Sequence, residues 1–200
     1  GGVCSPNSYQ NDSDNYFHTT SMSRMATYIT SGMGNTCGTV GGGNNAPIVT
    51  VPLISYSIPN GTPFILSASG SDPNGNTLTY TWEQVDLAPV GGISTPPIST
   101  DISGPNFRSR PASTNPVRYF PVFDNVVNGV DNAYEVLPTV ARTMNFRVTV
   151  RDNAAIYGCT DEADVAITTT ASGPFQVTAP TGPVTLNFNG SNTFNVTWDV

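Results

Sequence analysis

Short stretches in which apolar and polar residues alternate occupy the middle of this 200-residue chain, and they restrict it to a β-rich fold. Residues 78–83 alternate in this way, and residues 144–151 repeat the pattern. Successive side chains of a strand point to opposite faces of a sheet, so a period of two predicts strands buried on one face. Sequences rich in Pro, Asn and Gly, such as 59–61 and 72–75, lie between the stretches and indicate turns.

The pattern predicts a mainly β fold, and more specifically an immunoglobulin-like β-sandwich. The candidate strands are residues 48–51, 54–58, 64–69, 78–85, 117–120, 134–137, 143–151 and 163–169. Short strands of this number, one of them carrying a Trp of the buried type, are typical of such a sandwich. The stretch from 86 to 116 is a long excursion rich in Pro and Ser. A loop of that length is either functional or held down by side-chain packing.

Residues 1–46 form a separate unit before the strands, with one short helix predicted at 21–31. Apolar residues at positions 22, 25, 28 and 29 share one helix face, Ser21 is a suitable N-cap, and Gly32 stands where a terminating glycine is expected. A single helix of this length cannot form a domain alone. We therefore expect its apolar face to pack on a body N-terminal to this chain.

Residues 173–200 read as the start of a second β-sandwich that is cut off early. Strand patterns at 175–178, 184–188 and 193–200 follow one another, and Trp198 stands in its strand much as Trp82 does in residues 78–85. The chain starts at Gly1 without a Met and stops inside the last of these patterns, so we expect it to be a piece of a longer polypeptide.

Composition and charge exclude several classes of protein. The net charge of −7 argues against a nucleic-acid partner, because phosphates would be repelled. No apolar run approaches the roughly 18 residues that a membrane helix needs. Charged residues make up only 10% of the chain, against about 25% in an average soluble protein. A surface of Ser, Thr and Asn is common in secreted β-rich modules.

The chain lacks the residues for the common hydrolytic sites. A catalytic zinc needs about three protein ligands, and this chain has one His and no His-Glu-x-x-His sequence. Gly-x-Ser-x-Gly and phosphate-binding glycine loops are also missing from the sequence. We expect His18 to be a packed residue beside the start of the helix.

A calcium site is one of two interpretations of the turn at residues 72–76. Asp72, Asn74 and Asn76 offer oxygen ligands at alternating positions, and Asp152 could contribute if it lies at the same end of the sandwich. A turn between two strands requires the same Asp, Asn and Gly residues without any metal. The sequence leaves both interpretations open.

The three cysteines divide into a candidate pair and a remainder. Cys4 and Cys37 flank the predicted helix, and in a protein outside the cytosol this spacing suits a disulfide that ties the linker to the preceding body. Cys159 is left over, either as a free thiol or with a partner outside this chain.

Three arginines, Arg108, Arg110 and Arg118, lie close together in the sequence beside aromatic residues. One interpretation is a binding patch for an acidic glycan or peptide. The other is that the arginines fix the long loop by bonding backbone carbonyls and stacking on aromatic rings.

The order of several motifs resembles a known family. Residues 4–7 and 11–21, followed by the helix and Cys37-Gly38, look like the C-terminal end of a reprolysin-like metzincin zinc protease. Residues 45–47, 58–64, 78–84, 107–109, 118–121 and 140–147 resemble the immunoglobulin-like domain that follows the catalytic domain in large secreted bacterial members.

The resemblance implies a division of the chain and a function for its parent. Residues 1–46 would be the end of the catalytic domain and a linker, 47–172 the Ig-like domain, and 173–200 the next module. The parent would be a secreted or cell-surface bacterial protease that hydrolyses protein or peptide substrates with a zinc-bound water. Its Ig-like domain would serve as a spacer, a docking module or a substrate-binding module, and it would contact the remainder of its own chain.

The departure from the family pattern is that every zinc ligand and the catalytic Glu are missing, so no catalytic residue transfers to this chain. Two other classes stay open: a cell-surface adhesin or glycan-binding module that uses residues 86–116 and the arginine-aromatic segment, and a structural surface or filament protein.

Overall fold

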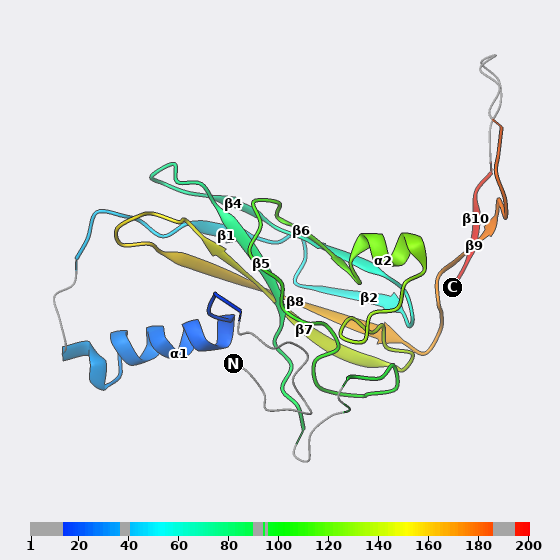
Figure 1. Cartoon of the computed structure of the whole chain (residues 1–200), viewed down its shortest axis with the longest axis horizontal. Coiled ribbons are helices and arrows are strands. Elements are labelled where there is room, and N and C mark those ends of the chain that lie inside the picture. Colours follow the sequence, from blue (N-terminus) through cyan, green and yellow to red (C-terminus); the bar gives the residue numbers. More distant parts are fainter. Residues whose placement is uncertain (1–13, 37–40, 90–93, 95, 186–194) are drawn as a thin grey trace.

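The computed structural model describes residues 14–36, 41–89, 94, 96–185 and 195–200, and these residues form a mainly β structure (Figure 1). The strands are β1 (Ile48–Thr50), β2 (Ser55–Pro59), β3 (Phe64–Ser67), β4 (Ser69–Ser71), β5 (Thr79–Gln84), β6 (Val117–Phe120), β7 (Arg142–Arg151), β8 (Thr160–Thr170), β9 (Gln176–Ala179) and β10 (Thr197–Asp199). The helices are α1 (Thr19–Thr30), the 3₁₀ turn η1 (Met33–Thr36) and α2 (Phe123–Asn128). The predicted β-rich class is confirmed.

The largest sheet has four strands in the order β2-β8-β7-β5. β7 pairs antiparallel with both β5 and β8, whereas β2 pairs parallel with β8. The alternation read from the sequence sets the faces of this sheet: Phe146, Val148 and Val150 are all fully buried. Trp82 lies opposite Val148 across the β5–β7 pair and is also buried.

Two shorter ladders complete the β structure of the central part. β3 pairs antiparallel with β6, and β1 pairs antiparallel with β4. The single strand expected at 64–69 is divided in two at Ala68, whose N–H donates to the carbonyl of Pro116 instead of to a strand partner. The chain therefore changes its pairing partner from β6 to β1 at this residue.

The core is centred on four phenylalanines from different segments. Phe64 of β3 stacks on Phe120 of β6 with ring centroids 5.0 Å apart, and Phe120 meets Phe146 of β7 edge-on at 4.8 Å. Phe107 of the long loop packs edge-on against Phe120 at 5.3 Å. Such aromatic contacts add to the burial of apolar area. They join the four-stranded sheet, the β3–β6 ladder and the loop into one core.

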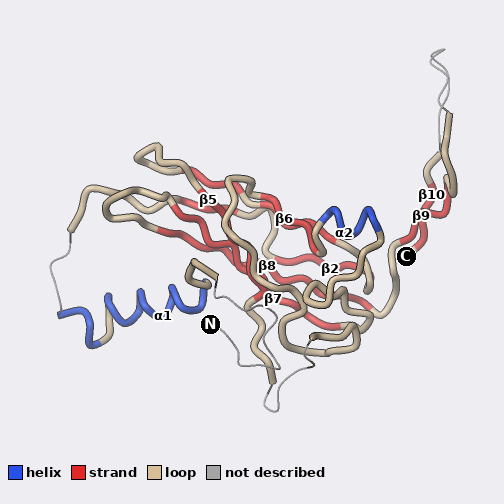
Figure 2. The backbone as a smooth tube through the Cα atoms, in the orientation of Figure 1, coloured by secondary structure: helices blue, strands red, loops and turns tan. Residues whose placement is uncertain are grey.

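The segment between β5 and β6 runs as loop wherever it is described (Figure 2). The strand expected at 134–137 does not form. Its backbone makes an isolated bridge to the 106–108 segment, in which Val136 N–H donates to Asn106 O and Arg108 N–H donates to Tyr134 O, and Glu135 N–H donates to Asn132 O in the preceding turn. Sequence alternation alone cannot distinguish such a bridge from a ladder.

The N-cap of helix α1 lies three residues before the predicted one, Ser21. Its N-cap position is His18, which makes no side-chain capping bond. Instead the N–H of Thr19 donates to Oε2 of Glu83 at 2.8 Å. A carboxylate from strand β5 therefore takes the place of the usual N-cap side chain, because the first N–H groups of a helix need an acceptor.

The last described residues form a small antiparallel hairpin of β9 and β10. Phe175 and Trp198 face each other at 6.5 Å between ring centroids, and both are exposed. The hairpin and α1 lie at opposite ends of the molecule (Figure 1). The strand expected at 184–188 falls largely outside the described residues. In the described ranges, no helix has the length and apolar character needed to cross a membrane.

Candidate binding site

The outer face of the four-stranded sheet carries a polar anchor for the segment that leads into α1. Glu83 of β5 has a side chain that is only 5% exposed. Its Oε1 lies 2.6 Å from Nδ1 of His18, and its Oε2 accepts the N–H of Thr19. A buried carboxylate must be compensated by donors, and here both oxygens are. His18 is therefore a packed residue beside the helix start, as the sequence predicts.

Further bonds tie the same segment to the sheet. Arg151 of β7 donates from Nη2 to the carbonyl of Phe17 at 3.0 Å, and from Nη1 to the hydroxyl of Thr81 at 2.8 Å. Burial lowers the pKa of Arg151, and the charge of Glu83 opposes that effect. Tyr16 adds a bond of 2.9 Å to Ser109 of the long loop. Residues 16–19 are thus fixed on the sheet by several side chains.

Most of α1 makes few contacts with this sheet. Its apolar residues Met25, Tyr28 and Ile29 are exposed, and so is Met33 in the following turn. Hollows lie along both sides of the helix, one beside Arg147 and the other beside Arg151. The apolar face that the sequence predicts is real, and its packing on a body outside this chain stays a prediction.

On the opposite side of strand β5, a buried ion cluster surrounds Arg118 of β6. Its Nη1 donates to the carbonyl of Trp82 at 2.5 Å, and its Nη2 donates to the carbonyl of Arg108 at 2.6 Å. The guanidinium also lies 4.4 Å above the ring of Phe120. Burial lowers the pKa of Arg118 to about 10, although the charge of Glu135 opposes the shift.

Glu135 is the acid of this cluster and its side chain is fully buried. Its Oε1 accepts Nε of Arg110 at 2.8 Å and lies 3.3 Å from Nη2 of Arg118, while Oε2 accepts the N–H of Val122. These contacts support the interpretation that the arginines fix the loop, at least for Arg118. Sequence analysis missed Glu135, since nothing near it in sequence marks it as buried.

The loop is also held at its middle by Arg142 of β7. The Arg142 guanidinium donates to the carbonyls of Asp101 and Gly104 at 2.9 and 2.6 Å. Oε1 of Gln84 accepts the N–H of Asn106 at 2.8 Å. The sequence analysis left two expectations for the loop at residues 86–116, a functional loop or one held down by side-chain packing. These contacts favour the second.

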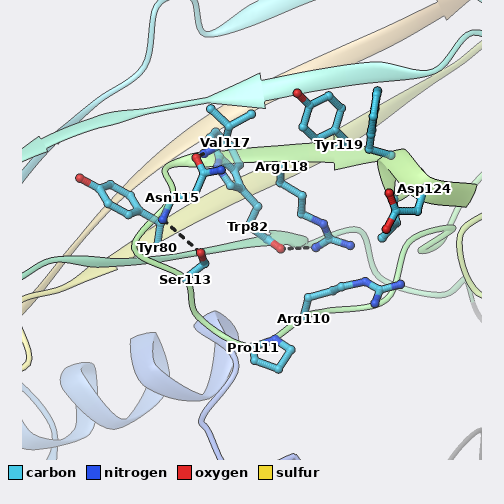
Figure 3. A pocket seen from close by; sticks show the side chains of 12 residues that line it. Tyr80, Trp82, Arg110, Pro111, Ser113, Asn115, Val117, Arg118, Tyr119 and Asp124 are labelled. Carbon is cyan, nitrogen blue, oxygen red and sulfur yellow. Dashed lines mark hydrogen bonds between the residues drawn. The ribbon is translucent and has the colours of Figure 1, made fainter. Parts of the chain in front are cut away.

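A pocket opens beside this cluster, between β5, the 110–115 segment and the β6–α2 region (Figure 3). Its volume is about 260 Å³. Arg110, Ser113 and Asn115 line one side, and Tyr119 and Phe123 line another. The two aromatic rings are 5.0 Å apart with planes tilted by 53°, and both are exposed. This surface combines charged, polar and aromatic groups in one hollow.

The proposed calcium ligands separate into two groups. Oδ1 of Asp72 accepts the N–H groups of Asn74 and Asn76, each at 2.9 Å, which is the bonding of an ordinary Asp-led turn. Oδ2 of Asp72 and Oδ1 of Asn76 are buried and have no hydrogen-bond partner among the described residues. No cluster of three or more His, Cys, Asp or Glu that suits a metal occurs in the described ranges.

Asp152 has its own set of partners. It accepts the N–H of Cys159 at 2.9 Å, the N–H of Ala154 at 3.2 Å and the side-chain amide of Asn44. Burial raises the pKa of Asp152, but these donors outweigh burial and lower it below its ordinary value. Asn44 is followed by Asn45, whose N–H donates to Oδ1 of Asn74 at 2.8 Å. The 44–45 segment therefore bridges the two groups.

Of the three cysteines, Cys159 belongs to the described residues. Cys4 and Cys37 lie outside the described residues, so their disulfide stays a prediction. Cys159 is a free thiol as far as the described chain extends, and its Sγ lies 3.3 Å from the carbonyl of Tyr157.

Comparison with known proteins gives no match: no family model, no curated protein and no solved structure is significantly similar to this chain.

Proposed function

We propose that this chain is the non-catalytic portion of a secreted, multidomain bacterial zinc metalloprotease, and that its Ig-like domain holds the end of the catalytic domain in a fixed position. The order of the family motifs along the sequence supports the first part. The anchoring of residues 16–19 on the four-stranded sheet supports the second, and it is the observation on which the proposal depends most.

The pairing of the strands supports an Ig-like sandwich for residues 47–172. One sheet would contain β2, β8, β7 and β5, and the other would contain β1, β4, β3 and β6. This pairing resembles that of Ig-like domains, in which the strand with the core Trp pairs with the penultimate strand. Trp82 of β5 meets that description, since it is buried and pairs with β7.

The residues of this chain do not fit the catalytic zinc that the family implies. The chain has a single His, and Nδ1 of that His18 is already placed 2.6 Å from Glu83. The proposal therefore assigns zinc and peptide-bond hydrolysis to the parent protein outside this segment. The role of this segment is positional, because Glu83 and Arg151 fix the chain just before α1. Helix α1, and the catalytic domain that would pack on its apolar face, would then have a defined orientation relative to the sheet.

Hydrogen exchange of the 200-residue chain tests this anchoring. We expect the amides of α1 to be protected, and His18→Ala to speed their exchange about tenfold, because a hydrogen bond to a charged group is lost. The amides of β7 and β8 should keep their protection. Arg24→Ala, on the exposed side of the same helix, is the matched control and should leave the exchange of α1 unchanged.

The proposal fails at this point if the α1 amides of the unaltered chain exchange as fast as those of an unfolded peptide. In that case the segment before β1 would be only a tether, and the Ig-like domain would not position it.

A further inference from the structure

The pocket beside β6 and α2 collects hydrogen-bond donors that the protein itself does not use. Oγ of Ser113 accepts the N–H of Asn115 at 3.1 Å, which leaves the hydroxyl hydrogen able to donate. Oδ1 of Asn115 accepts the N–H of Val117 at 3.0 Å, which leaves the amide NH₂ group. Both residues line the pocket.

Arg110 adds a charged donor to the same wall. Its Nε is taken by Glu135, but its two Nη atoms make no hydrogen bond to any residue that the structure describes. Among the described residues, Glu135 is the carboxylate that pairs with both Arg110 and Arg118, and Asp124 in the same pocket makes no ion pair with either. The free edge of Arg110 is therefore suited to a carboxylate, which it can bind through two parallel bonds.

The facing side of the pocket is aromatic. Tyr119 is 38% exposed and Phe123 is 53% exposed, and their rings form an angled surface next to the donors. Asp124 lies in the first turn of α2, at the same end of the pocket as the guanidinium groups of Arg110 and Arg118 (Figure 3). Its carboxylate can accept hydrogen bonds from hydroxyl groups.

We propose that this pocket binds an acidic sugar, namely one uronic acid residue of a polysaccharide. The carboxylate of the sugar would bind the free edge of Arg110, and one ring face would pack on Tyr119 and Phe123. Its hydroxyl groups would bond Ser113, Asn115 and Asp124. The volume of about 260 Å³ lies just below the range for drug-sized ligands, and so fits a single ring.

A sugar fits these groups better than an extended peptide does. A peptide bound as a strand added to β5 would need a free edge of that strand. The edge of β5 next to the pocket is already occupied, because Tyr80 and Ser113 exchange backbone bonds of 2.7 and 3.0 Å. Polar groups spread around an aromatic face match a ring that carries hydroxyls on its rim. This inference does not depend on the protease proposal.

Calorimetric titration of the 200-residue chain with trigalacturonic acid tests the site. We expect binding, and binding at least about tenfold weaker for the neutral galactose trisaccharide, because a charge-assisted bond is missing. Arg110→Gln should weaken binding of the acidic trisaccharide about tenfold for the same reason. Arg24→Gln removes the same charge from exposed α1 and should leave binding unchanged.

Arg110 also contacts buried Glu135, so Arg110→Gln can weaken binding by disturbing the fold. A second variant separates the two effects. Phe123→Ala changes an exposed ring and should weaken binding about tenfold while the thermal unfolding of the protein is retained. The proposal is overturned if the acidic trisaccharide gives no heat, or if it binds no better than the neutral one. Tighter binding of a short glutamyl peptide than of the trisaccharide would also overturn it, in favour of an acidic-peptide site.

Discussion

Two buried carboxylates, Glu83 and Glu135, each hold a set of polar contacts beside the β core. Each is surrounded by donors from segments distant in sequence: Glu83 by residues 18 and 19, and Glu135 by two arginines and a backbone N–H. Removing a partner from such a buried group costs more than the bond contributes, because the remaining charge is left without compensation.

At the residue scale, the sequence identified the cationic partners more readily than the acids. The run of arginines beside aromatic residues was visible, and Arg118 does stack on Phe120. Glu83 and Glu135 look like surface acids in the sequence, because their burial depends on chain segments that only the tertiary structure brings together. The start of α1 was misplaced for the same reason, since its acceptor is supplied by β5.

Asp72 gives a test of the calcium interpretation. Asp72→Ala should lower the free energy of unfolding by about 1 to 2 kcal/mol, because the N–H groups of Asn74 and Asn76 lose their acceptor. These bonds alone account for the turn, so we expect chemical denaturation to give the same loss in EDTA and in calcium. Asp131→Ala, at an exposed position, is the control. A clearly larger loss in calcium would instead make Asp72 a ligand.

At the scale of elements, strand β3 shows why the alternating pattern predicted the sheets so well. Neighbouring residues Ile65 and Leu66 have the same number of carbon atoms, but Ile65 is 55% exposed and Leu66 only 2%. The pleat of a strand places them on opposite faces. The positions of the core strands therefore followed from the sequence, whereas the ends and partners of the strands did not, and the strand expected at 134–137 does not form.

This pair of residues provides a matched stability test. Leu66→Ala should lower the free energy of unfolding by about 3 kcal/mol, since it leaves a cavity in the core. Ile65→Ala should change it by less than about 1 kcal/mol, because an exposed side chain loses little burial. Chemical denaturation of the two variants measures both values. Equal losses would mean that β3 does not have the faces described.

Two departures from the predicted strands share a physical cause. The expected strand at 134–137 has neighbours on one side only, and the break at Ala68 is produced by a bond to Pro116. Both features depend on where the long loop between β5 and β6 returns to the core. The periodicity of a segment carries no information about such distant partners.

At the scale of the whole molecule, the described parts are arranged in a row. The α1 segment lies at one end of the four-stranded sheet and the β9–β10 hairpin lies at the other (Figure 1). Exposed apolar side chains are found at both ends, on Tyr28 and Ile29 of α1 and on Trp198 of β10. In the proposed role as a positioning module between a catalytic domain and a further module, these side chains would contact the neighbouring domains.

The most direct test of that role is peptide sequencing of the natural polypeptide upstream of Gly1, together with its intact mass. The account predicts a His-Glu-x-x-His-x-x-Gly-x-x-His stretch followed by a Met-turn, because those residues would supply the zinc ligands and the base that this chain lacks. A mature polypeptide that begins at Gly1, or an upstream region without that motif, would contradict the protease assignment.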